Sequence, residues 1–176
     1  FADMGVADQF AIGLAIAFGY LALLGVAERR TGITLPIALA IVFAALALLS
    51  HAAGWISMIF ANAALAGTAF IAGVVARFGG APAIGRGGLV AACVLLAVFP
   101  VAIYRQAYHE IPWWVFLLVA GAPLILLPLE VKAMEKLPSW ASALIRIGCV
   151  ALLVGFGLLY GLGGGEEAID SMSNYQ

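Results

Sequence analysis

Residues 31–76 read TGITLPIALAIVFAALALLSHAAGWISMIFANAALAGTAFIAGVVA, and these 46 residues contain no Asp, Glu, Lys or Arg. As a single helix rising about 1.5 Å per residue, the stretch would be roughly 69 Å long. The hydrocarbon core of a bilayer is only about 30 Å thick, so one crossing does not use the stretch up. Near its middle, a polar pair, Ser50 and His51, precedes Gly54 and Trp55, an aromatic residue typical of the membrane boundary. The pattern predicts a hairpin of two membrane-spanning helices joined by a very short turn.

The composition of the whole chain indicates that lipid is its solvent. Of the 176 residues, 65% are hydrophobic and 10% are charged, and the mean hydropathy is +1.15. Soluble domains carry about 25% charged residues, and a water-soluble core of this size could not bury so much apolar surface. The net charge of −1 gives no electrostatic reason to expect a nucleic-acid partner. We therefore expect an integral membrane protein of a bacterial inner membrane that binds membrane lipids and no nucleic acid.

The hydrophobic pattern predicts an all-α fold, a bundle of six transmembrane helices. Residues 1–9 are expected to form an extracytoplasmic or interfacial N-terminal segment, and residues 163–176 a flexible, acidic extracytoplasmic tail. Prolines are expected to interrupt the fourth and fifth spans. The six expected spans are residues 10–27, 33–49, 55–75, 89–104, 113–129 and 140–162.

The distribution of Lys and Arg assigns the two faces of the bundle. The loops after the first, third and fifth spans, together with the early turns of the sixth, carry seven of the eight basic residues. Only Arg105 lies on the other side, so the basic loops are expected to face the cytoplasm and both termini the outside. Because no basic residue precedes the first span, we interpret it as a retained span and not as a cleaved signal. The seven residues are Arg29, Arg30, Arg77, Arg86, Lys132, Lys136 and Arg146.

Asn62 is the most polar residue well inside the predicted bilayer, and Ser57 and Thr68 share its span. One interpretation is an interhelical hydrogen bond, worth on the order of 0.6 kcal/mol in a membrane. The other is a polar contact in a pore or ligand cavity. The middle of every predicted span lacks Asp, Glu, Lys and Arg, which lowers the odds of an ion-coupled carrier.

The two histidines, His51 and His109, fall on the outer face in the predicted topology. They could hold a metal or an axial haem position, or they could be interfacial residues that never meet. Cys93 and Cys149 each lie in an apolar run without a metal or redox spacing, which indicates small buried side chains. We expect no metal and no cofactor, but bound lipid.

Small residues recur at the four-residue spacing that lets helices approach closely in lipid. This spacing predicts helix packing, either within the bundle or against another subunit. The residues concerned are Gly13, Ala17, Ala63, Gly67, Ala69, Gly73, Gly157 and Gly161.

The sequence contains no nucleophile–base pair and no His-Glu-x-x-His, so an enzyme is not favoured. The leading prediction is a non-catalytic integral membrane subunit of a larger membrane complex, packing against partner helices and lipid as a homo- or hetero-oligomer. One alternative is a small solute transporter or channel, with Asn62 and the proline-broken spans four and five lining its path. A second alternative is a haem- or quinone-associated anchor of a redox complex that uses His51 and His109.

Overall fold

The computed structural model of the chain describes residues 11, 14–15, 17–19, 21–24, 33–79, 86–106, 111–129 and 138–173. These residues are 92% helical and contain no strand. Four of their helices are long and apolar enough to cross a membrane, namely Thr34–Ala52, Ile56–Phe78, Gly87–Gln106 and Ser139–Gly163. The lengths and apolar composition of these helices indicate an integral membrane protein. Of the other two predicted spans, the first is described only in part, and the fifth contains the shorter apolar helix Trp113–Leu126.

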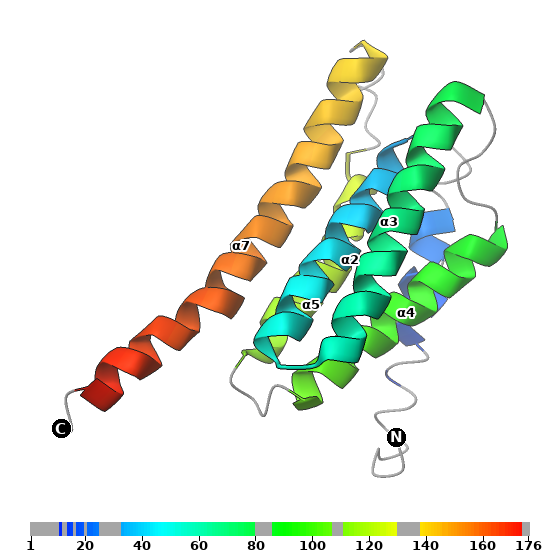
Figure 1. The fold of residues 1–176 in the computed structure, drawn as a ribbon. Helices are drawn as coiled ribbons and strands as arrows, with labels where there is room; N and C mark the ends of the chain where they lie inside the picture. The colour runs from blue at the N-terminus through cyan, green and yellow to red at the C-terminus, as the bar shows by residue number, and fades with distance from the viewer. Residues whose placement is uncertain are drawn as a thin grey trace.

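Helices α2 (Thr34–Ala52) and α3 (Ile56–Gly79) form the hairpin predicted from residues 31–76 (Figure 1). Gly54 sits in the turn with φ = 69°, in the left-handed region that glycine adopts without steric penalty. The N–H of Gly54 donates to the carbonyl of His51, and the N–H of Trp55 donates to that of Ser50, both at 2.9 Å. This pair of bonds is the Schellman arrangement that closes a helix C-terminus. The predicted break in the hydrophobic stretch is therefore confirmed.

Helix α2 is the central helix of the described bundle (Figure 1). It packs against α3 and against α4 (Arg86–Gln106), α5 (Trp113–Gly121), the short 3₁₀ helix η1 (Ala122–Leu126) and α7 (Ser139–Ser173). Of its 19 residues, 12 are buried. Because the helix is apolar on all sides, it can be enclosed by neighbours without placing charges in the interior.

The fifth predicted span is not one α-helix. Helix α5 ends at Gly121, and the chain continues as η1 and then as a turn through residue 129. Pro123 explains the change, because its ring lacks an N–H and clashes with the carbonyl four residues earlier. Pro100, in contrast, lies inside α4 without ending it.

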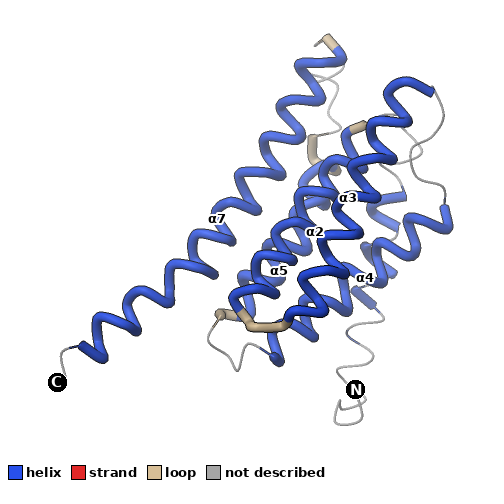
Figure 2. The backbone as a smooth tube through the Cα atoms, viewed as in Figure 1, coloured by secondary structure: helices blue, strands red, loops and turns tan. Residues whose placement is uncertain are grey.

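Helix α7 has 35 residues and extends about 52 Å at 1.5 Å per residue. It passes through Gly163 and ends at Ser173, beyond the predicted end at residue 162 (Figure 2). The structure therefore gives a helix where the sequence predicted a flexible tail. Glycine disfavours a helix by about 1 kcal/mol relative to alanine but does not forbid it, and Glu166 and Glu167 after the glycines are good helix formers.

Two glycines allow α7 to pack closely on its neighbours. A Cβ on Gly157 would lie 2.9 Å from Cγ2 of Val119, and a Cβ on Gly161 would lie 2.9 Å from Cδ2 of Leu49. These distances are shorter than a normal carbon–carbon contact of about 3.5–4.0 Å. Gly73 plays the same part between α3 and α2, where a Cβ would lie 3.3 Å from Cδ1 of Ile37.

Candidate functional site

Asn62 on α3 faces α2 and is fully buried. Its Nδ2 donates to Oγ of Ser50 at 3.3 Å and to the carbonyl of Met58, one turn earlier on its own helix, at 3.0 Å. Oγ of Ser50 in turn donates to the carbonyl of Leu46 at 2.7 Å. Oδ1 of Asn62 is buried and has no hydrogen-bond partner among the described residues. The geometry is that of an interhelical contact within the hairpin.

Ser57 and Thr68 do not join Asn62 in a common site. Both side chains are exposed, whereas Asn62 is buried between the two helices. The hydroxyl of Thr68 donates to the carbonyl of Ala64 at 2.8 Å, so its own helix satisfies it. The three polar residues of span three therefore do not line one path.

Arg146 on α7 is the residue whose environment the sequence did not anticipate. Its side chain is only 2% exposed, and its Nη2 donates to the carbonyl of Leu129 at 3.2 Å. Leu129 follows η1, so the guanidinium lies at the carbonyl end of the fifth segment, where a positive charge is electrostatically favoured. Arg146 thus connects the start of α7 to the end of the preceding helical segment.

The burial of Arg146 follows from its place on α7, and the sequence alone does not show that this face points inward. Arg146 belongs to a face of α7 on which one residue per turn is buried, and the neighbours on that face are small or β-branched. A charge placed on such a repeat points into the bundle rather than to lipid or water. The face comprises Ser142, Arg146, Val150, Val154 and Gly157.

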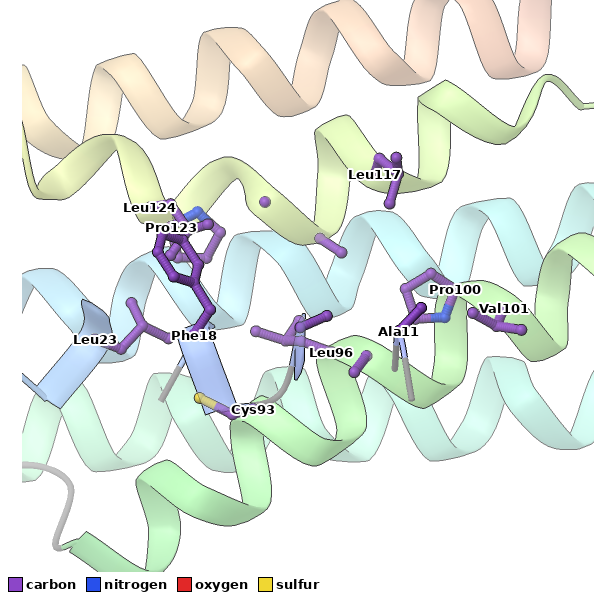
Figure 3. A pocket seen from close by; sticks show the side chains of 15 residues that line it. Ala11, Phe18, Leu23, Cys93, Leu96, Pro100, Val101, Leu117, Pro123 and Leu124 are labelled. Atoms are coloured by element: carbon purple, nitrogen blue, oxygen red, sulfur yellow. The ribbon is translucent and has the colours of Figure 1, made fainter. Parts of the chain in front are cut away.

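A cavity of about 420 Å³ lies between α4, the α5–η1 segment and the described residues among 11–24 of the first predicted span, called the N-terminal segment from here on (Figure 3). Ala11, Phe18 and Leu23 contribute from the N-terminal segment, while Cys93 and Leu96 contribute from α4. The remaining lining residues are Ala15, Gly19, Ala97, Pro100, Val101, Leu117, Ala120, Gly121, Pro123 and Leu124. Every lining side chain is apolar except the thiol of Cys93, so the cavity offers a polar solute almost no hydrogen-bonding group.

The cavity lies between the proline-containing spans four and five, where the sequence suggested a transport path. Asn62, which the same suggestion placed on that path, is not among the residues that line it. The apolar walls are poorly suited to water, since a buried water needs two to four polar partners. The cavity lies where the transport path was suggested, but its apolar walls favour an apolar occupant over a polar solute.

The described residues bring no histidine or cysteine cluster together. His51 is exposed at the end of α2, and His109 lies outside the described residues, so their separation stays untested. No group of three or more His, Cys, Asp or Glu that could hold a metal occurs in the described ranges. Cys93 is buried in the cavity wall, and Cys149 is half-buried on α7.

The small residues predicted to pack helices divide into two groups. Gly73, Gly157 and Gly161 face neighbouring helices of the same chain, as described above, and Ala69 is partly buried and packs against the hydrophobic core. Ala17, Ala63 and Gly67 are exposed, and a Cβ on Gly67 would meet nothing within 4 Å. Gly13 lies outside the described residues.

Comparison with known proteins gives no further assignment. No protein-family model, curated protein or solved structure matches the chain.

Proposed function

We propose that the chain is a non-catalytic, six-span subunit of a larger membrane complex, with both termini on the extracytoplasmic side. The observation that carries the proposal is the position of α3. Among the described elements, α3 packs extensively only against α2, and only 11% of the residues in its apolar stretch are buried. Lipid can cover such a helix, and so can a neighbouring transmembrane helix.

The outer face of α3 has the composition of a helix–helix interface in lipid. Ala63, Ala64 and Gly67 are exposed in its centre, and the side chains of Phe60 and Ile71 are exposed above and below them. Small residues let two backbones approach, and in a membrane this close packing drives association. The small residues on the other face, around Gly73, are already used against α2.

The six-span topology is supported by the directions of the helices. In Figure 1, α2 runs toward the hairpin turn, α3 runs away from it, α4 returns, α5 and η1 run away, and α7 returns. The described residues of the N-terminal segment, which line the cavity together with residues of α4 and α5, would provide the remaining crossing.

Aromatic side chains mark both ends of the bundle. Trp55 and Trp113 lie at the end with the hairpin turn, and exposed Trp140 lies at the start of α7, at the opposite end. Tryptophan is enriched at both membrane interfaces, and α2, between the two levels, is about 28 Å long. The bacterial inner membrane is part of the proposal, and the basic loops give the orientation of the chain in it.

Purification from the native membrane in a mild detergent, followed by native mass spectrometry, tests the subunit proposal. We expect stoichiometric partner chains or a second copy, and we expect Gly67→Leu to reduce their recovery at least fivefold. Gly155→Leu on α7 is the matched control, because a Cβ there also meets nothing within 4 Å. A monomer from the unsubstituted chain, with solute flux in liposomes made from it alone, would contradict the proposal in favour of a transporter.

The topology has its own test. A tag added after Gln176 should react with an impermeant reagent from outside intact cells, whereas a cysteine replacing exposed Arg77 at the end of α3 should not. The reverse pattern would overturn the orientation without affecting the fold.

A further inference from the structure

We propose that the cavity between the N-terminal segment, α4 and α5–η1 binds the acyl chain of a membrane lipid. The site goes beyond the subunit function, since it does not involve the outer face of α3. Its volume of about 420 Å³ is nearly three times that of the roughly 150 Å³ apolar cavity that stays dry and binds benzene. Unlike that enclosed cavity, this one is partly open, so it is a recess between helical segments and not a void inside them.

The chemistry of the walls selects a hydrocarbon. The cavity is lined by Ala, Leu, Val, Phe, Pro and Gly, with the thiol of Cys93 as the one weakly polar group. A headgroup, an ion or a sugar would lose its hydration there without gaining hydrogen bonds. An alkyl chain has no hydrogen bonds to water to lose, and in the cavity it gains dispersion contacts with the walls.

The shape of the cavity fits a chain rather than a compact ligand. Figure 3 shows Leu23, Phe18 and Cys93 toward one end and Ala11, Pro100 and Val101 toward the other. From Cys93 to Val101, eight steps along α4, the helix advances about 12 Å. The long direction of the cavity therefore follows the helices.

The cavity opens sideways toward the bilayer. Phe18 and Leu117 are lining residues, yet their side chains are 63% and 61% exposed. Both residues lie within apolar helical segments. In a membrane, their exposed side chains therefore contact the hydrocarbon core of the bilayer. A lipid already in the bilayer could insert one chain between them without passing through water.

Two features of the sequence keep the space open. Pro100 and Pro123 lie on opposite walls, and the conversion of α5 to the 3₁₀ helix η1 moves the backbone off a regular helical path. The wall positions between them are small, and a Cβ on Gly19 or Gly121 would meet nothing within 4 Å. Larger side chains at these positions would fill the cavity from inside.

Photolabelling of the full chain in phosphatidylcholine vesicles tests the proposal, with palmitic acid bearing a mid-chain diazirine as the probe. We expect adducts concentrated on residues 93–101 and 117–124. Gly121→Leu and Ala97→Phe, which fill the cavity from opposite walls, should each reduce these adducts at least fivefold. Gly155→Leu adds the same side chain at an open position outside the cavity and should leave them unchanged. Adducts spread over the outer faces of α3 and α7, or adducts that both filling variants leave intact, would overturn the proposal.

The two cysteines provide a second readout, in which the reporter chain keeps every lining residue of the cavity. In a Cys149→Ser chain, delipidated in detergent, added palmitic acid should slow alkylation of Cys93 by N-ethylmaleimide at least fivefold. In a Cys93→Ser chain, the same addition should not change alkylation of Cys149, which lies outside the cavity. An unchanged rate at Cys93 would contradict occupancy. Displacement of the photolabel by an isoprenoid quinone at a tenfold lower concentration than by phosphatidylglycerol would overturn the assignment to an acyl chain.

Discussion

Nδ2 of Asn62 lies 3.3 Å from Oγ of Ser50, and this contact is a polar link between α2 and α3. Each partner also bonds to a carbonyl of its own helix, Asn62 to Met58 and Ser50 to Leu46. Neither side chain therefore depends wholly on the other. The contact can orient the hairpin while contributing little to its stability.

A double-mutant cycle of Ser50→Ala and Asn62→Ala should give a coupling free energy of about 0.6 kcal/mol, the average for hydrogen bonds between membrane helices. Asn62→Ala also removes the buried Oδ1 that has no partner among the described residues, which limits its effect further. Reversible unfolding in mixed micelles of dodecyl maltoside and dodecyl sulfate measures the stability of each variant, and the coupling free energy follows from these stabilities. A coupling well above about 1.7 kcal/mol would mean that the pair is part of a larger polar network.

Gly54→Ala should destabilise the hairpin by about 1–2 kcal/mol through backbone strain alone. The residue has φ = 69°, and a Cβ there meets nothing within 4 Å, so no steric clash contributes. Gly67→Ala is the control, because its Cβ also enters open space. Among the described glycines, Gly54 has a positive φ and Gly67 does not, so the control adds a Cβ without this backbone strain. Equal stability of the two variants in the same unfolding assay would show that the turn does not need the left-handed conformation.

The hairpin was predictable because its signals are local. A charge-free stretch of 46 residues must fold back, and glycine after a polar pair is a helix-ending signal. Pro123 likewise predicts the end of α5, since the missing N–H is a property of the residue and not of its surroundings.

Which side of each helix faces inward was not predictable, because lipid and protein interior are both apolar. Leu46 and Leu48 lie two residues apart on α2, yet the first is 0% and the second 49% exposed. On α7, Val154 is buried and Leu152 is largely exposed. In a soluble helix, polar residues on the outer face would reveal this difference, but here the outer face is as hydrophobic as the inner one. The cavity escaped prediction for the same reason, since it depends on how three segments meet.

Gly157→Ala should lower the stability of the bundle by about 1–3 kcal/mol, the usual effect of overpacking. The new Cβ would lie 2.9 Å from Cγ2 of Val119, whose β-branched side chain has little rotamer freedom. Gly161→Ala should cost less, because its nearest neighbour is the end of the more flexible Leu49 side chain. Gly155→Ala, in open space, is the reference. Unfolding in mixed micelles should rank the three in this order, and a neutral Gly157→Ala would mean that α7 packs less closely on α5 than the structure indicates.

Arg146→Met should destabilise the bundle by about 1.5–3 kcal/mol, the range for a hydrogen bond that involves a charged group. The substitution keeps much of the side-chain volume but removes the Nη2 donor, so the carbonyl of Leu129 loses a bond to a side chain that is only 2% exposed. Arg105→Met is the matched control, because Arg105 is exposed in the last turn of α4 and its replacement should change the stability by less than about 0.5 kcal/mol. Arg146→Lys keeps the charge without the planar guanidinium and should fall between the two. Equal stability of Arg146→Met and Arg105→Met would contradict this prediction. Arg146 would then be one of the buried charges that an apolar residue of similar volume replaces without loss of stability. Apolar contacts beside Arg146 would then have to hold α7 against the fifth segment.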